Sequence, residues 1–211
     1  MMINSEKAVF IDTNVLFYAS NFKKYDILNW LNSVYPQIIV HEDVWKEVRT
    51  QHNQKLIQPF LTDGTWRLFE TAEFSSISLE VYNTRKEAIT TAFLKMNRYR
   101  RQQGLRVKNT ADLGEIAILA TCLMLNTGLI CSNDFDIRTV IEQEHYSIFD
   151  ESLAQEKLIQ QDSVADFCVK AYQNQVANRK AVRTFYKAVV GTSDYAQQQL
   201  DYFDQRLLKS K

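Results

Sequence analysis

The segment VFIDTNVLFYAS, residues 9–20, begins with a short apolar run that ends at an aspartate. Residues 9–11 predict a strand, because a continuous apolar run bounded by polar residues suits a strand that is covered on both faces. Asp12 then lies where that strand ends, and residues 14–20 predict a helix. A carboxylate at the edge of the core makes Asp12 a candidate functional residue.

Strands and helices alternate along the first part of the chain. Further strands are predicted at residues 38–40, 129–131 and 146–150, and a long helix without Gly or Pro at residues 79–101. Another helix is predicted at residues 110–125. Such alternation is typical of a parallel sheet with helices on both faces. We therefore predict an α/β fold, in which a parallel β-sheet is sandwiched by helices.

The pattern changes after residue 150. From residue 151 onward only helical spacing is visible, as in Val164, Phe167 and Cys168. We therefore predict an α/β domain at residues 1–150 and a helical C-terminal extension at residues 151–211. The extension carries several aromatic residues, which we expect to pack on the domain, on a second copy of the chain or on a protein inhibitor.

Composition narrows the class of protein. Hydrophobic residues make up 45% of the chain and charged residues 24%, as in soluble globular proteins. The formal net charge is zero, so a nucleic-acid surface would have to be a local patch. Three cysteines without metal-binding spacing fit a reducing cytosol. The longest apolar stretch, residues 116–125, is too short to span a bilayer, so we expect a cytoplasmic protein without membrane association.

Carboxylates gather where the predicted strands end and the following helices begin. The acids in these positions are Asp12, Glu47, Asp112, Glu115, Asp134 and Asp136. Each one alone suits a helix N-cap or first turn, where acids complement the macrodipole. Together they predict a ligand site, because open parallel sheets bind ligands beyond the carboxyl ends of their strands. Clustered carboxylates repel one another unless a cation neutralises them, and oxygen ligands without Cys or His suit Mg²⁺ or Mn²⁺.

Four segments resemble the motifs of the PIN-domain ribonucleases, a family that includes the toxins of bacterial toxin–antitoxin pairs. The segments are VFIDTNVLF, IIVHEDVWKEV, DLGEIAILA and LICSNDFDIR, between residues 9 and 138. The resemblance implies a PIN-like fold, and it implies that Asp12, Glu47, Glu115 and Asp134 are the metal-binding, catalytic acids. It also implies RNA as the substrate and a cognate antitoxin as a partner.

Two further acids are candidate metal ligands. Asp112 shares a helix face with Glu115 at i, i+3 spacing, which leaves the third ligand open between these two residues. The Gly114–Glu115 pair is similar to the family pattern and favours Glu115. Asp136 repeats Asp134 at an offset of two residues and is therefore also a candidate.

The implied chemistry is hydrolysis of an RNA phosphodiester bond at one or two Mg²⁺ or Mn²⁺ ions. We expect Asn14 to hydrogen-bond a carboxylate ligand and Ser132 to position a ligand or phosphate. Thr13 is expected to cap the following helix. His41 is interpreted as a structural residue at a strand end, because a metal-activated water needs no imidazole base.

A basic segment precedes the third motif. Its basic residues are Arg85, Lys86, Lys95, Arg98, Arg100, Arg101, Arg106 and Lys108, against the single acid Glu87. Many charge runs are only solvated helix faces. The asymmetry within a neutral chain favours a surface that docks RNA through Arg98, Arg100, Arg101 and Arg106, with Tyr99 stacking on an unpaired base. We also expect the chain to form a homo-oligomer.

Two other functions compete with a ribonuclease. A haloacid-dehalogenase-like phosphatase also places an Asp after its first strand, but its chemistry uses a D-x-D pair and residue 14 here is Asn. A non-catalytic PIN-like module would bind RNA or protein without cleaving it. The presence of all four acids favours the enzyme.

Overall fold

The computed structural model describes residues 7–105, 107, 113–150, 152–192 and 195–209. It has a mixed α/β fold around a five-stranded parallel sheet with strand order β3-β2-β1-β4-β7. The strands are β1 (Ala8–Ile11), β2 (Gln37–His41), β3 (Trp66–Phe69), β4 (Leu129–Cys131) and β7 (Gln160–Asp162). The predicted parallel sheet covered by helices is confirmed.

The central strand is β1, and it is buried along its whole length, as its apolar run predicted. Val9 pairs with Ile38 of β2, and Phe10 pairs with Ile130 of β4. The chain builds β2 and β3 on one side of β1 and then adds β4 and β7 on the other side. This reversal makes the carboxyl ends of β1 and β4 the switch point of the sheet, where open α/β folds form their ligand crevice.

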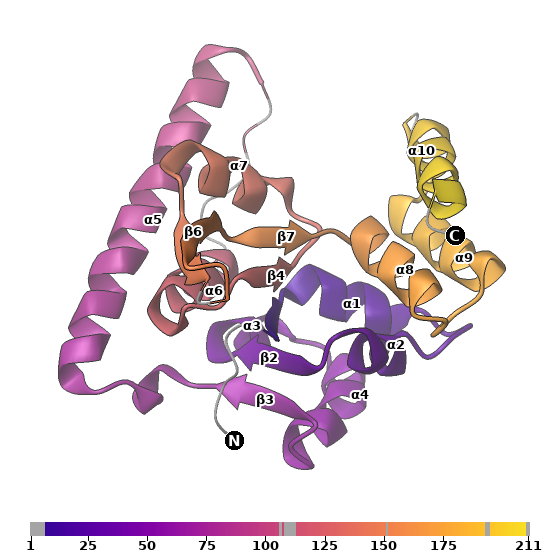
Figure 1. Cartoon of the computed structure of the whole chain (residues 1–211), viewed down its shortest axis with the longest axis horizontal. Helices are drawn as coiled ribbons and strands as arrows, with labels where there is room; N and C mark the ends of the chain where they lie inside the picture. Colours follow the sequence, from indigo (N-terminus) through magenta and orange to yellow (C-terminus); the bar gives the residue numbers. More distant parts are fainter. Residues whose placement is uncertain (1–6, 106, 108–112, 151, 193–194, 210–211) are drawn as a thin grey trace.

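Helices pack in two groups around the sheet. The helices are α1 (Thr13–Asn21), α2 (Ile27–Val34), α3 (Glu42–Glu47), α4 (Gln51–Thr62), α5 (Ser76–Gln102), α6 (Leu113–Leu125), α7 (Phe135–Glu144), α8 (Val164–Gln173), α9 (Arg179–Val190) and α10 (Ala196–Lys209), with a short 3₁₀ turn at Thr71–Glu73. Helix α1 contacts α2 and α4, and α2 contacts α8, whereas α5 contacts α6 and α7. Figure 1 shows α5 along one side of the molecule and α8, α9 and α10 together near its opposite end. Every helix in the described ranges is too short or too polar to cross a membrane.

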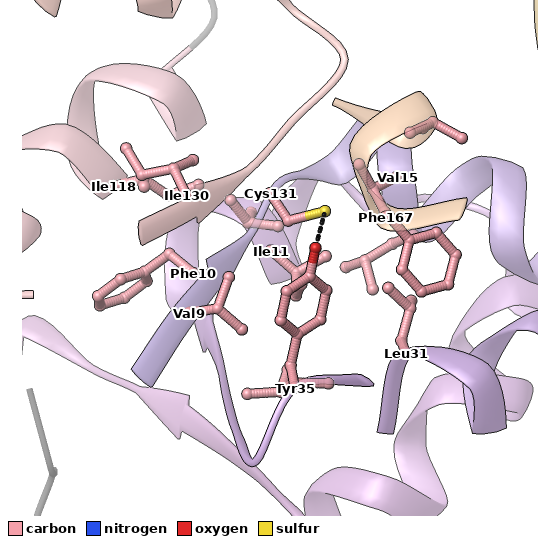
Figure 2. Packing of buried hydrophobic residues seen from close by; sticks show 14 of the residues in the cluster. Val9, Phe10, Ile11, Val15, Leu31, Tyr35, Ile118, Ile130, Cys131 and Phe167 are labelled. Carbon is pink, nitrogen blue, oxygen red and sulfur yellow. Dashed lines mark hydrogen bonds between the residues drawn. The ribbon is translucent and has the colours of Figure 1, made fainter. Parts of the chain in front are cut away.

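The C-terminal helices share the core of the sheet. Phe167 of α8 is fully buried and stacks on Tyr35, with the ring centroids 6.1 Å apart. Figure 2 shows the Tyr35 side chain reaching toward Cys131 at the end of β4, with its hydroxyl 3.6 Å from the sulfur. The same hydroxyl donates to Asp162 Oδ2 at 2.8 Å. Burial raises the pKa of the Tyr35 phenol, so this hydroxyl keeps its proton and remains a donor.

The prediction that residues 151–211 are helical alone is wrong. Residues Gln155–Leu158 form β6, which pairs antiparallel with β5 (Ser147–Asp150) in a separate two-stranded sheet, and β7 then joins the central sheet. The segment QEKLIQQD lacks the apolar run that marks a buried strand, so tertiary pairing overrides its local pattern. The division at residue 150 remains a prediction, although one strand of the central sheet lies beyond it.

The long helix expected at residues 79–101 is confirmed as α5, which begins slightly earlier. Helix α4 and strand β3 were not predicted. The first residues of the helix predicted at residues 110–125 and the candidate ligand Asp112 lie outside the described residues.

Candidate active site

Asp12 begins the site at the carboxyl end of β1, where its side chain is 3% exposed. Its Oδ1 accepts a hydrogen bond from the Thr13 N–H at 2.7 Å, so Asp12 itself is the N-cap of α1. The expectation that Thr13 caps this helix is therefore wrong. An N-cap needs an extended backbone, and Asp12 has it with φ −85° and ψ 157°, whereas Thr13 is already helical.

Ser132 and Asn14 connect Asp12 to the segment that follows β4. The Ser132 hydroxyl donates to Asp12 Oδ2 at 2.7 Å across 120 residues of sequence, and the Asn14 amide donates to the same oxygen. Asn14 Oδ1 accepts from the Asn133 N–H at 2.9 Å. The hydrogen bond expected from Asn14 to a carboxylate is thus present, and the first and fourth motifs are in direct contact.

Asp134 lies three residues after the end of β4, and like Asp12 it caps the helix that follows its strand. It is buried, it caps α7, and its Oδ1 accepts from the Asp136 N–H at 2.9 Å. Its own N–H donates to Ser132 Oγ at 3.0 Å, so Ser132 touches both carboxylate residues. We call Asp12, Asn14, Ser132 and Asp134 the strand-end site.

Glu47 joins the second and third motifs to this site. It lies at the end of α3, where Oε1 accepts from the Gly114 N–H at 3.0 Å and Oε2 accepts from the Thr13 hydroxyl at 2.5 Å. A Cβ at position 114 would lie 2.9 Å and 3.0 Å from the two Glu47 oxygens, so glycine permits this approach. Thr13 therefore orients Glu47, a role that its local sequence did not predict.

Glu115 and Asp136 take different positions around the strand-end site. Glu115 lies in the first turn of α6, next to the Gly114 N–H that binds Glu47. Asp136 is buried in the first turn of α7, and its Oδ1 lies 2.8 Å from Arg100 Nη2. This carboxylate raises the pKa of Arg100. A predicted metal ligand and a predicted RNA contact are thus paired with each other.

The basic segment is only partly turned outward. Lys86 pairs with Asp43 at 3.6 Å and Lys95 with Glu144 at 2.9 Å, although the Lys95 side chain is still 74% exposed. The described residues that remain as exposed candidate RNA contacts are Arg98, Tyr99 and Arg101 near the end of α5, while Arg106 lies outside the described ranges. Their role as RNA contacts stays a prediction.

The residues of the strand-end site match Mg²⁺ or Mn²⁺ in donor type but do not form a four-carboxylate cage. Among the described residues, no three His, Cys, Asp or Glu side chains lie close enough together to hold an ion. Glu47 satisfies its carboxylate with an N–H and a hydroxyl. Mg²⁺ is commonly held by one or two carboxylates plus water and substrate phosphates. Asp12 and Asp134, joined through Ser132, fit that arrangement.

His41 does not serve as a base in this site. It is fully buried, its Nδ1 accepts from the Asp43 N–H at 3.0 Å, and it caps α3. Burial lowers the pKa of the imidazole to about 4, against the opposing effect of Asp43 and Glu42. The interpretation of His41 as a structural residue is confirmed.

Gln161 supports the site and was missed by the sequence analysis. Its buried side chain reaches from β7 and donates from Nε2 to the carbonyl oxygens of Ser132 and Asp134, each at 2.8 Å. The amide therefore fixes the loop that carries Asp134. Its segment was interpreted as helical, and a polar residue there gives no signal of a buried strand.

Comparisons with known proteins add a distant structural likeness. No protein-family model matches the chain, and no curated protein matches it. Among solved structures, it is similar to a crystal structure of VapBC2 from Rickettsia felis bound to a DNA fragment from their promoter, at 17% identity and a TM-score of 0.36. The match covers 63% of this chain and 92% of that one. The case for a function therefore rests on the geometry of the site.

Proposed function

We propose that this protein is a metal-dependent ribonuclease that hydrolyses RNA phosphodiester bonds at the strand-end site. The observation that carries the proposal is the meeting of all four PIN-like motifs at the switch point of the sheet. Ser132 and Asn14 join the first motif to the fourth, and Glu47 joins the second to the first and third. This convergence supports one shared site for segments that are far apart in sequence.

In this proposal Asp12 and Asp134 hold the Mg²⁺ or Mn²⁺ ion. When bound, the metal lowers the pKa of a water and stabilises the charge that develops on the phosphate. Ser132 and Asn14 fix the Asp12 carboxylate, because both donate to its Oδ2. Glu47 and Glu115 complete the acidic surroundings from α3 and from the first turn of α6, and the choice of third ligand between Asp112 and Glu115 remains open.

A non-catalytic PIN-like module is the second candidate, and one observation favours it. Two of the predicted metal ligands already have partners in the same chain. Glu47 accepts from the Gly114 N–H and the Thr13 hydroxyl, and Asp136 accepts from Arg100. A phosphatase of the haloacid-dehalogenase type is less well supported, because residue 14 contributes an amide and no carboxyl. A role as the toxin of a toxin–antitoxin pair, with an antitoxin partner, is implied by the sequence resemblance alone, and a homo-oligomeric state stays an expectation from the sequence.

RNA cleavage by the purified chain tests the proposal. We expect labelled RNA to be cut with Mg²⁺ or Mn²⁺, cleavage to stop with EDTA, and Asp12→Asn to abolish it. Asp26→Asn is the matched control, because Asp26 also caps a helix and Asn is an equally good cap. Hydrolysis of p-nitrophenyl phosphate without RNA cleavage would support the phosphatase, and metal-independent RNA binding without cleavage would support the module.

A further inference from the structure

A groove of about 690 Å³ lies beside the strand-end site. It runs between α7 and the C-terminal helices, and we call it the α7–α10 groove. Its walls include Asn133, Phe135, Arg138, Tyr186, Tyr202 and Arg206. Asn133 and Phe135 flank Asp134 in the chain, and the Asn133 N–H donates to Asn14 Oδ1, so one wall of the groove contacts the strand-end site.

Aromatic side chains in this groove are open to a ligand. Phe135 is 54% exposed at the start of α7, and Tyr202 is 65% exposed on α10. Tyr186 of α9 is held by packing on Phe203, with the ring centroids 4.4 Å apart. Exposed aromatic rings beside a cleft suit unpaired nucleic-acid bases, since every base offers a face for stacking.

The charges of the groove favour an anionic ligand. Arg206 lies 2.6 Å from Asp166 and Arg138 lies 3.8 Å from the same carboxylate, so two guanidinium groups face one acid. Arg138 also lies 5.8 Å from the centre of the Phe135 ring. A guanidinium beside an exposed ring can hold a phosphate while the ring stacks on a base.

We infer that the α7–α10 groove binds unpaired nucleotides of the RNA strand that flank the scissile phosphate. The inference rests on the proposed function for the identity of the ligand. Its own basis is the contact of the groove wall with the strand-end site through Asn133, the two exposed rings and the excess of arginine over acid. The groove volume also lies in the usual range of about 300–1,000 Å³ for small-ligand sites.

Binding of a labelled short oligouridine to full-length Asp12→Asn protein tests the groove without cleavage. In that background, Tyr202→Ala and Phe135→Leu should each raise the Kd by roughly 5-fold to 150-fold, the usual effect of one lost stacking platform. Tyr195→Ala is the matched control, because Tyr195 is 71% exposed and does not line the groove. The affinity of the Tyr195→Ala variant for the oligouridine should equal that of the Asp12→Asn parent. Circular dichroism should show that all variants are folded.

The outcome separates the groove from the catalytic proposal. If the groove variants weaken RNA binding but the wild-type chain does not cleave RNA, the groove binds RNA and the proposed ribonuclease activity is wrong. If the wild-type chain cleaves RNA but all three variants bind RNA with equal affinity, the inference that the α7–α10 groove binds RNA is wrong, and a protein partner becomes the better candidate ligand. If the Asp12→Asn chain does not bind RNA, the inference that the groove binds RNA is also wrong.

Discussion

Asp12 and Asp162 are both buried carboxylates at strand ends of one sheet, but they accept hydrogen bonds from different kinds of group. Asp162 ends β7 and accepts from the Lys170 ammonium at 2.5 Å and from the Tyr35 hydroxyl at 2.8 Å. Asp12 follows β1 and accepts from a backbone N–H, a side-chain amide and a serine hydroxyl.

Position at a strand end therefore does not by itself identify a functional acid. Asp162 fastens α8 and the segment before β2 to the sheet, so its charge serves the fold. Asp12 caps α1 and touches the other motifs, and an Asn in its place keeps the cap and an acceptor oxygen. We therefore expect stability to depend on Asp162 and activity on Asp12.

The largest effect is expected at the end of β2, where protonation of His41 makes the free energy of unfolding depend on pH. His41 has a pKa of about 4 in the fold, below the value of about 6.5 expected in the unfolded chain. Since the unfolded state takes up the proton first, stability falls as the pH drops from about 6.5 to about 4, by about 3 kcal/mol.

His41→Asn isolates this effect, because Asn can still accept from the Asp43 N–H as an N-cap. Urea unfolding at a series of pH values should give a shallower pH dependence for His41→Asn over that interval. Parallel curves for the two proteins would show that burial does not keep His41 neutral.

Removing the charge of Asp162 should have the next largest effect. Asp162→Asn weakens the contacts with the Lys170 ammonium and the Tyr35 hydroxyl, and one lost hydrogen bond to a charged group costs roughly 1.5–3 kcal/mol. The free energy of unfolding in urea should fall by about 2 kcal/mol. An unchanged value would mean that this contact does not fasten α8 to the sheet.

The smallest effect is expected where Glu47 meets Gly114. Gly114→Ala places a Cβ 2.9 Å from Glu47 Oε1, so the carboxylate must move and its hydrogen bond is lost, at a cost of about 1 kcal/mol that roughly cancels the gain in helix propensity. In a Glu47→Ala background the same change should instead stabilise by up to about 1 kcal/mol, because Ala favours a helix over Gly. Equal effects in both backgrounds, measured by thermal unfolding, would show that the two residues are not coupled.

The local sequence predicted those elements of the fold whose burial is visible in their apolar pattern. The apolar runs of β1 and β4 and the unbroken pattern of α5 were sufficient, and they placed Asp12 and Asp134 at strand ends. Strand β7 was missed because QQD has no apolar residue, and its burial comes from pairing with β4.

The contacts within the site could not be predicted in the same way. The Thr13–Glu47 bond, the Gln161 bonds to the Asp134 loop and the Arg100–Asp136 pair join elements that only the tertiary fold brings together. The motif resemblance identified the candidate residues, but it did not show which of them form hydrogen bonds or ion pairs with one another. Gly114 is an example, since its Gly identity is explained only by the approach of Glu47.

The most direct test measures RNA cleavage and unfolding free energy for Asp12→Asn and Asp162→Asn side by side. We expect Asp12→Asn to lose cleavage while its stability stays within about 1 kcal/mol of the wild-type value. We expect Asp162→Asn to be less stable yet to cleave RNA with Mg²⁺ or Mn²⁺ where it is folded. Full cleavage by a folded Asp12→Asn chain would contradict the assignment of the strand-end site as a ribonuclease centre.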